Sequence, residues 1–401
     1  MQRKIFFFGL CFFTFIHFGS GYLSAQLQTE FGQSLLEREP ETPETEPAEL
    51  TVNAHISNTF NNHIELGLSV DPYTSSLAGQ DDPQLSGLIN RFGVNLNGDL
   101  PVVDKLRFKL QYTPQIENYT GAEGKLSEFN AFNNALSTEL RFQPVASLPS
   151  IVASYQVQRL LRTSNVYNNM EQQFGFRFGR VLEYNFRLHR FDDSESRRED
   201  FLLVGSNTHN MNARLQFGIL KQILGKLEYG LEQSSYETNL NNLILGVAGL
   251  EDNERRNDLR HIGSAKLIQV ATEQLMFQEE VNLFMNRSNV DFFTFVSTEV
   301  AASTFYRIET GRWLRFRLSR VWIDFQGRQI LNEMGIITED APDRSDRQIG
   351  ANLQLNWQFN THLTLNADYQ VNQNRTNEMD PFLDFLNYTH TIATVTLRGA
   401  Y

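Results

Sequence analysis

Apolar and polar residues alternate along most of the chain from Leu50 onward. In the segment 363–371, Leu, Leu, Ala, Tyr and Val occupy every second position, and the segment 351–359 shows the same alternation. Only residues 360–362 separate these two segments, which predicts a tight hairpin. A period of two is typical of β-strands with one apolar and one polar face, so the pattern predicts an all-β fold.

The number and spacing of the segments distinguish two all-β architectures. A soluble sandwich would need about fifteen strands in one pair of sheets, well above the usual size of a sheet. A transmembrane β-barrel has strands of about ten residues, apolar toward lipid and polar toward the interior, with short turns alternating with longer loops. The chain follows the second pattern, because short connections such as 101–104 and 360–362 alternate with long polar ones such as 116–130 and 237–257.

The alternation predicts a single antiparallel transmembrane barrel of sixteen strands. The strands are expected at 50–70, 87–100, 105–115, 131–143, 150–160, 171–181, 184–192, 203–220, 226–236, 258–270, 274–286, 293–308, 312–326, 346–359, 363–374 and 387–401. The first is ambiguous, since a turn at Asn61-Asn62 would split it into two strands. The shared even parity of its apolar residues favours one strand, and an even total places both ends of the barrel on one side of the membrane. Fourteen and eighteen strands are the alternatives.

The N-terminal residues have a different character. Residues 1–25 have the parts of a secretory signal peptide: a basic start, a Phe-rich apolar stretch and a small residue, Ala25, at the expected cleavage site. We therefore predict that the protein is exported and cleaved after Ala25. Residues 26–49 are rich in Pro and Glu and cannot form an apolar core, so they are expected to be a disordered acidic spacer in the periplasm. The barrel occupies 50–401.

The composition excludes several other classes of protein. With 47 Asp and Glu against 35 Lys and Arg, the net charge of −12 argues against a nucleic-acid partner. A mean hydropathy of −0.37 excludes a bundle of transmembrane helices. The single cysteine, Cys11, lies in the predicted signal peptide, and the histidines show no metal-ligand spacing. We therefore predict no metal, no cofactor and no enzymatic activity.

The last strand carries a more specific signal. One of its faces bears Thr391, Ala393, Val395, Leu397, Gly399 and the final aromatic residue, Tyr401. This resembles the terminal strand of Gram-negative outer-membrane β-barrel proteins, a porin-like class, in which the final aromatic residue is recognised by the barrel-assembly machinery. The resemblance implies a place in the outer membrane, contact with its lipid, and that machinery as a partner through Tyr401. It identifies the class and no particular family within it.

Strand parity assigns more basic than acidic side chains to the interior, although the whole chain is acidic. The candidates for lining a pore are Arg107, Lys109, Arg141, Arg177, Arg187, His189, Arg214, Arg315, Arg317 and Arg398. Arg315 and Arg317 alternate with apolar residues that define the lipid side, where an arginine would cost about 2–4 kcal/mol at the bilayer midplane. Like charges around a pore favour ions of the opposite sign. Alternatively, these residues pair with carboxylates and stiffen the wall.

Aromatic residues gather near the strand ends, among them Trp313, Trp322 and Trp357. We interpret them as girdles at the two membrane–water interfaces.

These observations favour an outer-membrane channel for passive diffusion of small hydrophilic solutes, with a mild preference for anions. Sixteen strands leave an aqueous interior wide enough for such solutes. The alternative is a structural barrel with an interior filled by paired charges, whose spacer or loops bind another periplasmic or envelope protein. An embedded lipid-modifying enzyme is the third interpretation, and no recognisable catalytic motif supports it.

Overall fold

The computed structural model describes residues 49–61, 87–121, 130–145, 148–163, 168–191, 205–239, 255–330, 340–377, 379 and 387–400. The predicted signal peptide, nearly all of the predicted spacer and Tyr401 lie outside these residues.

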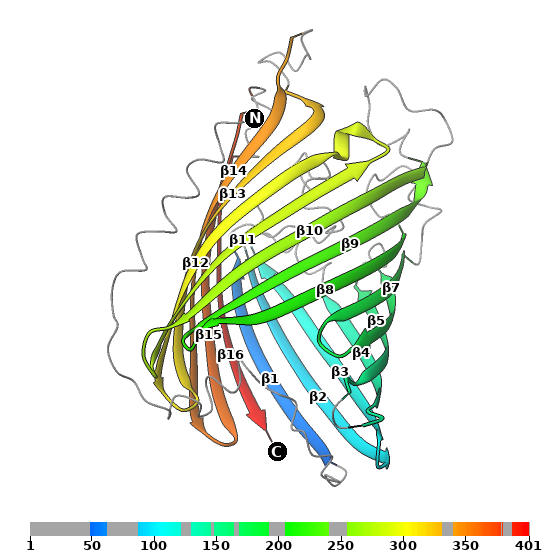
Figure 1. The fold of residues 1–401 in the computed structure, drawn as a ribbon, viewed down its shortest axis with the longest axis vertical. Coiled ribbons are helices and arrows are strands. Elements are labelled where there is room, and N and C mark those ends of the chain that lie inside the picture. The colour runs from blue at the N-terminus through cyan, green and yellow to red at the C-terminus, as the bar shows by residue number, and fades with distance from the viewer. Residues whose placement is uncertain are drawn as a thin grey trace. The chain divides into compact units, whose positions relative to one another are not determined.

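The described residues form sixteen antiparallel strands that close into one barrel (Figure 1). The strands are β1 (Glu49–Asn61), β2 (Gly87–Val103), β3 (Leu106–Gly121), β4 (Ala131–Phe142), β5 (Ile151–Arg162), β6 (Asn169–Phe178), β7 (Leu182–Phe191), β8 (Ser206–Leu220), β9 (Ile223–Asn239), β10 (Arg255–Val270), β11 (Leu275–Ser288), β12 (Phe295–Glu309), β13 (Arg312–Gln329), β14 (Asp343–Asn360), β15 (Leu363–Thr376) and β16 (Thr389–Ala400). Consecutive strands are neighbours, and the barrel closes where β1 pairs with β16. The predicted fold class and the predicted strand number are confirmed.

Several strands run further at their loop ends than the alternation predicts. β3 continues to Gly121, although the sequence predicts an end at 115. Glu117 lies in this extension and accepts a hydrogen bond from Arg91 Nε at 3.1 Å, so the polar run belongs to the sheet rather than to a loop. In β1 the described strand ends at Asn61, and the rest of the predicted strand 50–70 lies outside the described residues.

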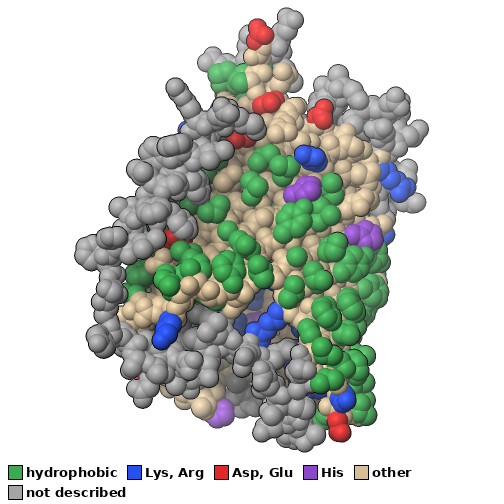
Figure 2. Space-filling model, in the orientation of Figure 1, with side chains coloured by type: hydrophobic (Ala, Val, Ile, Leu, Met, Phe, Trp, Pro, Cys, Tyr) green, Lys and Arg blue, Asp and Glu red, His purple; other side chains and the backbone are tan. Residues whose placement is uncertain are grey.

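The two faces of the wall differ in character. On β13, Phe316 and Leu318 are 43% and 49% exposed, whereas Arg317 between them points the other way and pairs with Glu280 and Glu299. The exposed apolar side therefore forms the exterior and the charged side forms the interior. Hydrophobic side chains gather over much of the visible exterior in Figure 2. In the described ranges, no helix is long and apolar enough to cross a membrane.

The short turns lie at one end of the barrel, at the bottom of Figure 1 together with the end of β16. In the β12–β13 turn, Gly311 has a φ of +78°, which is open to glycine but strained for a residue with a Cβ. A Cβ there would also lie 2.9 Å from Cβ of Gln358 on β14. The two-residue turn therefore depends on glycine for its backbone and for its close approach to β14.

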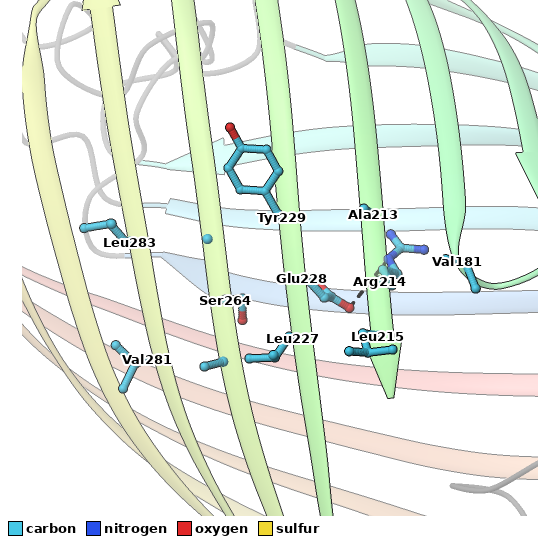
Figure 3. A pocket seen from close by; sticks show the side chains of 12 residues that line it. Val181, Ala213, Arg214, Leu215, Leu227, Glu228, Tyr229, Ser264, Val281 and Leu283 are labelled. Atoms are coloured by element: carbon cyan, nitrogen blue, oxygen red, sulfur yellow. Dashed lines mark ion pairs between the residues drawn. The ribbon is translucent and has the colours of Figure 1, made fainter. Parts of the chain in front are cut away.

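A recess of about 530 Å³ lies in the wall formed by β8 to β11. Figure 3 shows Leu227, Tyr229 and Leu283 around it, and each of these side chains is exposed on the exterior. The small residues Gly263 and Ala265 also line it and leave the space that larger side chains would fill. The recess therefore opens on the exterior of the barrel and is not a pocket of the interior.

Candidate functional site

Strand alternation and register place every predicted pore-lining residue on the interior face. These residues are Arg107, Lys109, Arg141, Arg177, Arg187, His189, Arg214, Arg315, Arg317 and Arg398. They come from β3, β4, β6, β7, β8, β13 and β16, so the site is a distributed lining rather than one pocket.

Three of the candidates lie in one cross-strand row close to the short turns. Arg107 on β3 is directly opposite Arg141 on β4. Val152 on β5 is opposite both Arg141 and Arg177, so the row continues onto β6. Neighbouring strands are about 4.8 Å apart, which brings these guanidinium groups within reach of shared carboxylates.

Carboxylates interleave with this row. Asp99 Oδ1 accepts a hydrogen bond from Arg107 Nε at 3.0 Å, and Asp99 Oδ2 lies 3.3 Å from Lys109 Nζ. Glu139 Oε1 lies 3.4 Å from Arg141 Nη2. The opposite charges offset the repulsion between the two arginines, and all of these side chains remain partly exposed, so each pair contributes little to stability.

Arg214 and Arg317 each lie between two carboxylates. Arg214 is 3.0 Å from Glu183 and 3.5 Å from Glu228, which is the ion pair drawn in Figure 3. Arg317 is 3.0 Å from Glu280 and 2.6 Å from Glu299. These two arginines are therefore part of paired networks that stiffen the wall.

Arg187, Arg315 and Arg398 differ from the candidates above. Within the described ranges no carboxylate lies within ion-pair distance of any of the three, and their cross-strand partners include Gln173, Gln354 and Thr364. They lie on β7, β13 and β16, so the structure does not bring them together. The His189 ring packs against Phe191 in a tilted arrangement, with ring centroids 4.7 Å apart, as a wall residue would.

Two buried ion pairs that the alternation did not predict lie at the opposite, long-loop end of the interior. Arg256 Nη2 lies 2.5 Å from Asp258 Oδ2 on β10, and Arg344 Nη2 lies 2.6 Å from Asp346 Oδ2 on β14. Both are Arg-x-Asp sequences, and the alternation places both members of each pair on the same face. Opposite charges two residues apart were the signal that these positions belong to strands.

Apolar residues pack beside these ion pairs on the interior face. Phe295, Ile323 and Phe325 form a buried cluster. The guanidinium carbons of Arg328 and Arg344 each lie 5.1 Å from the centre of the Phe325 ring, a cation–π distance. This part of the interior is a packed layer of arginines and aromatic rings, which the alternation of apolar and polar residues did not predict.

The interpretation of the tryptophans as girdles is wrong for Trp313. Its ring stacks on Phe305 at 5.1 Å, and it shares the interior parity of Arg315. Trp322 has the opposite parity on the same strand, and Trp357 is directly opposite the exterior residue Arg312, so both lie on the exterior. Parity, rather than closeness to a strand end, decides which side an aromatic residue faces.

Among the residues that the structure describes, no three His, Cys, Asp or Glu side chains are grouped to hold a metal ion.

The closed sixteen-stranded barrel has an apolar exterior, a charged interior, and long connections at one end with short turns at the other. In a bilayer such an arrangement satisfies every backbone hydrogen bond within the wall while the apolar side chains meet lipid. The described residues therefore form a transmembrane β-barrel of the outer-membrane type, with an apolar exterior suited to contact with lipid.

No protein-family model matches the sequence, and no curated protein matches it. Several solved structures are similar to this chain in the path of the backbone. OprD of Pseudomonas aeruginosa has a TM-score of 0.47 and 8% identity, covering 88% of this chain and 95% of that one. OccAB4 of Acinetobacter baumannii has a TM-score of 0.47 and 8% identity, covering 89% and 100%. A structure described as a bacterial polysaccharide outer membrane secretin has a TM-score of 0.44 and 8% identity, covering 87% and 98%.

Proposed function

We propose that the protein is a channel through which small hydrophilic solutes diffuse passively across the outer membrane, with a preference for anions. The observation that carries the proposal is the set Arg187, Arg315 and Arg398. These are interior cations for which the described part of the chain provides no carboxylate partner. Unpaired cations in a confined interior attract anions and repel cations. Arg317, beside Arg315 on the same strand, lies between Glu280 and Glu299, which offset its charge.

Two of these cations lie near one end of the proposed channel. Arg315 follows closely after the β12–β13 turn, and Arg398 lies near the end of β16. Short turns face the periplasm in barrels of this kind. An anion entering from outside therefore meets the unpaired arginines last, at the periplasmic mouth.

The experiment is the conductance of the purified full chain in a planar lipid bilayer, with the reversal potential measured across a salt gradient. We expect steady conductance and a reversal potential of the sign that marks anion preference. The double variant Arg315→Gln, Arg398→Gln should move the reversal potential toward zero, because it removes interior charge without adding any of the opposite sign.

The matched control is Arg312→Gln. Arg312 lies on the same strand near the same turn, but its guanidinium sits over the Trp357 ring on the exterior, 4.6 Å from the ring centre. This control should leave the reversal potential unchanged. A reversal potential that responds equally to Arg312→Gln and to the double variant would contradict the assignment of the selectivity to the interior arginines.

A second candidate function is a structural barrel, and the packed layer at the long-loop end favours it. Arg344 is 2% exposed and Phe325 is 3% exposed, so this part of the interior is closed to solvent. A barrel that folds and inserts but conducts no ions would support this second function. The spacer 26–49 and the outer loops would then be the regions in which to search for an envelope protein partner.

We also infer the route by which the chain reaches the membrane. The N-terminal residues 1–25 would direct export and be removed after Ala25, and the barrel-assembly machinery would recognise the last strand through Tyr401. Replacing Tyr401 by Ser should lower the amount of heat-modifiable barrel in the outer membrane, whereas Thr389→Ser at the start of β16 should not. Equal amounts of folded barrel for the two variants would contradict the recognition of Tyr401.

A further inference from the structure

Three arginines and a tryptophan share one patch on the exterior of β13, β14 and β15. Trp322 on β13 is directly opposite Arg347 on β14, and Arg347 is directly opposite Arg375 on β15. Arg320 precedes Trp322 by two residues on the same face, and its guanidinium carbon lies 5.0 Å from the tryptophan ring centre. We call Arg320, Trp322, Arg347 and Arg375 the exterior arginine patch. All three arginines are exposed.

The patch holds like charges in direct opposition. Directly opposite side chains on one face have Cβ atoms about 4.5–5.5 Å apart, and like charges in such a pair are destabilising. In the interior, the opposed pair Arg107 and Arg141 has Asp99 and Glu139 as partners. For the three arginines of the patch, no ion pair is found with any residue in the described ranges. The arrangement leaves room for an anion from outside the protein.

The patch lies at the upper edge of the apolar exterior. On the side of the patch nearer the short turns the exterior is apolar. Ile349, opposite Arg320, is 54% exposed, and Leu318 is 49% exposed. On the side nearer the long loops the exterior is polar, with Asp324 directly opposite Ser345. A tryptophan at such an edge marks the interface between hydrocarbon and headgroups. The β13–β14 connection is one of the long ones, and in Figure 1 both strands rise to the end of the barrel away from the short turns.

From this placement we propose that the exterior arginine patch binds the phosphate groups of a lipid in the outer leaflet. The long loops face outward in barrels of this kind, so the patch meets the headgroup layer of that leaflet. A phosphate between Arg347 and Arg375 accepts charge-assisted hydrogen bonds from both guanidinium groups, a geometry for which arginine is well suited. Arg320 adds a third cation beside Trp322, whose ring packs against the lipid at the same depth. This site lies outside the barrel and does not depend on the proposed channel.

The experiment uses the purified full chain in detergent micelles, titrated with bis-phosphorylated lipid A and examined by native mass spectrometry. We expect the wild-type protein to retain one lipid A molecule. The double variant Arg347→Gln, Arg375→Gln should bind it at least about tenfold more weakly, since it loses charge-assisted bonds to phosphate. Lipid A from which the phosphates have been removed should bind the wild-type protein as weakly as the bis-phosphorylated form binds the variant.

The control variant is again Arg312→Gln, which removes an exterior arginine that lies over a tryptophan, pairs with Glu309 and is not part of the patch. Its affinity for lipid A should equal that of the wild type. Heat-modifiable migration on a gel checks that each variant is folded. Equal affinity of the wild type and the double variant, or of the two forms of lipid A, would overturn the proposal. An equal loss in Arg312→Gln would also overturn it, since binding would then follow net charge and not the patch.

Discussion

Arg344 and Asp346 lie two residues apart on one face of β14, and Arg344 Nη2 donates to Asp346 Oδ2 at 2.6 Å with both side chains almost completely buried. Arg256 and Asp258 repeat this relationship on β10. A buried ion pair of this kind need not stabilise a fold relative to apolar residues, but removing one member leaves the other charge buried and unpaired.

The first prediction follows from that asymmetry. Asp346→Ala should lower the free energy of unfolding by about 3–5 kcal/mol, because it leaves the Arg344 guanidinium buried without its carboxylate. The double variant Arg344→Leu, Asp346→Ala should lose less than this single variant. Urea titration of the barrel refolded in lipid vesicles measures both. A double variant less stable than Asp346→Ala would contradict the account.

The second prediction concerns the turn between β12 and β13. Gly311→Ala should cost about 1–3 kcal/mol, since alanine is strained at a φ of +78° and its Cβ would meet Gln358. Gly98→Ala is the matched control, because a Cβ at Gly98 has no heavy atom within 4 Å. The same urea titration compares them, and equal stability of the two variants would show that the turn tolerates a side chain.

The third prediction tests which face of the wall meets lipid. Leu227→Arg places a cation on the exterior and should cost about 2–4 kcal/mol if the residue lies near the bilayer midplane. Ser264→Arg places the same cation on the interior face, opposite Glu228, and should cost much less. Folding yield into vesicles, read from heat-modifiable migration, separates the two. A larger loss for Ser264→Arg would reverse the assignment of the faces.

The fourth prediction concerns a polar contact on the exterior. Tyr229 Oη and His261 Nδ1 are 2.8 Å apart and both side chains face outward. His261→Leu should cost about 1 kcal/mol, because it leaves the tyrosine hydroxyl without a partner beside lipid. Adding Tyr229→Phe should recover most of that loss in the urea titration. If the second change gives no recovery, the hydrogen bond does not contribute to stability.

The period-two alternation was sufficient to predict the strand number, the barrel and the face on which Arg315 and Arg317 lie. It failed at the long-loop ends, where Arg256 and Arg344 were assigned to loops. In a barrel with a polar interior, a charged residue within a strand and a charged residue in a solvated loop have the same hydropathy. The alternation carries no information there, and only the Arg-x-Asp spacing distinguishes the two.

The alternation along the chain also could not predict which interior charges form ion pairs. Parity places Arg315 and Arg317 on the same face, but it does not show that Arg317 lies between Glu280 and Glu299 while Arg315 faces Gln354. That difference depends on the register between strands, which a single sequence fixes only weakly. Trp313 is a further example, since its stacking on Phe305 requires the register of β12 and β13.

The pairing of β1 with β16 joins residues such as Thr59 and Thr394, whose hydroxyl oxygens are 3.0 Å apart although 335 positions separate them in the chain. This contact joins the first and the last strand of the wall in chain order. Because it closes the longest loop of any strand pair in the barrel, it has the largest cost in loop-closure entropy. A nascent or truncated chain that lacks β16 keeps two open edges, each with unpaired amide and carbonyl groups ready to join another strand. Pairing of β1 with β16 removes both open edges at once, so this single contact distinguishes a closed barrel from an incomplete one.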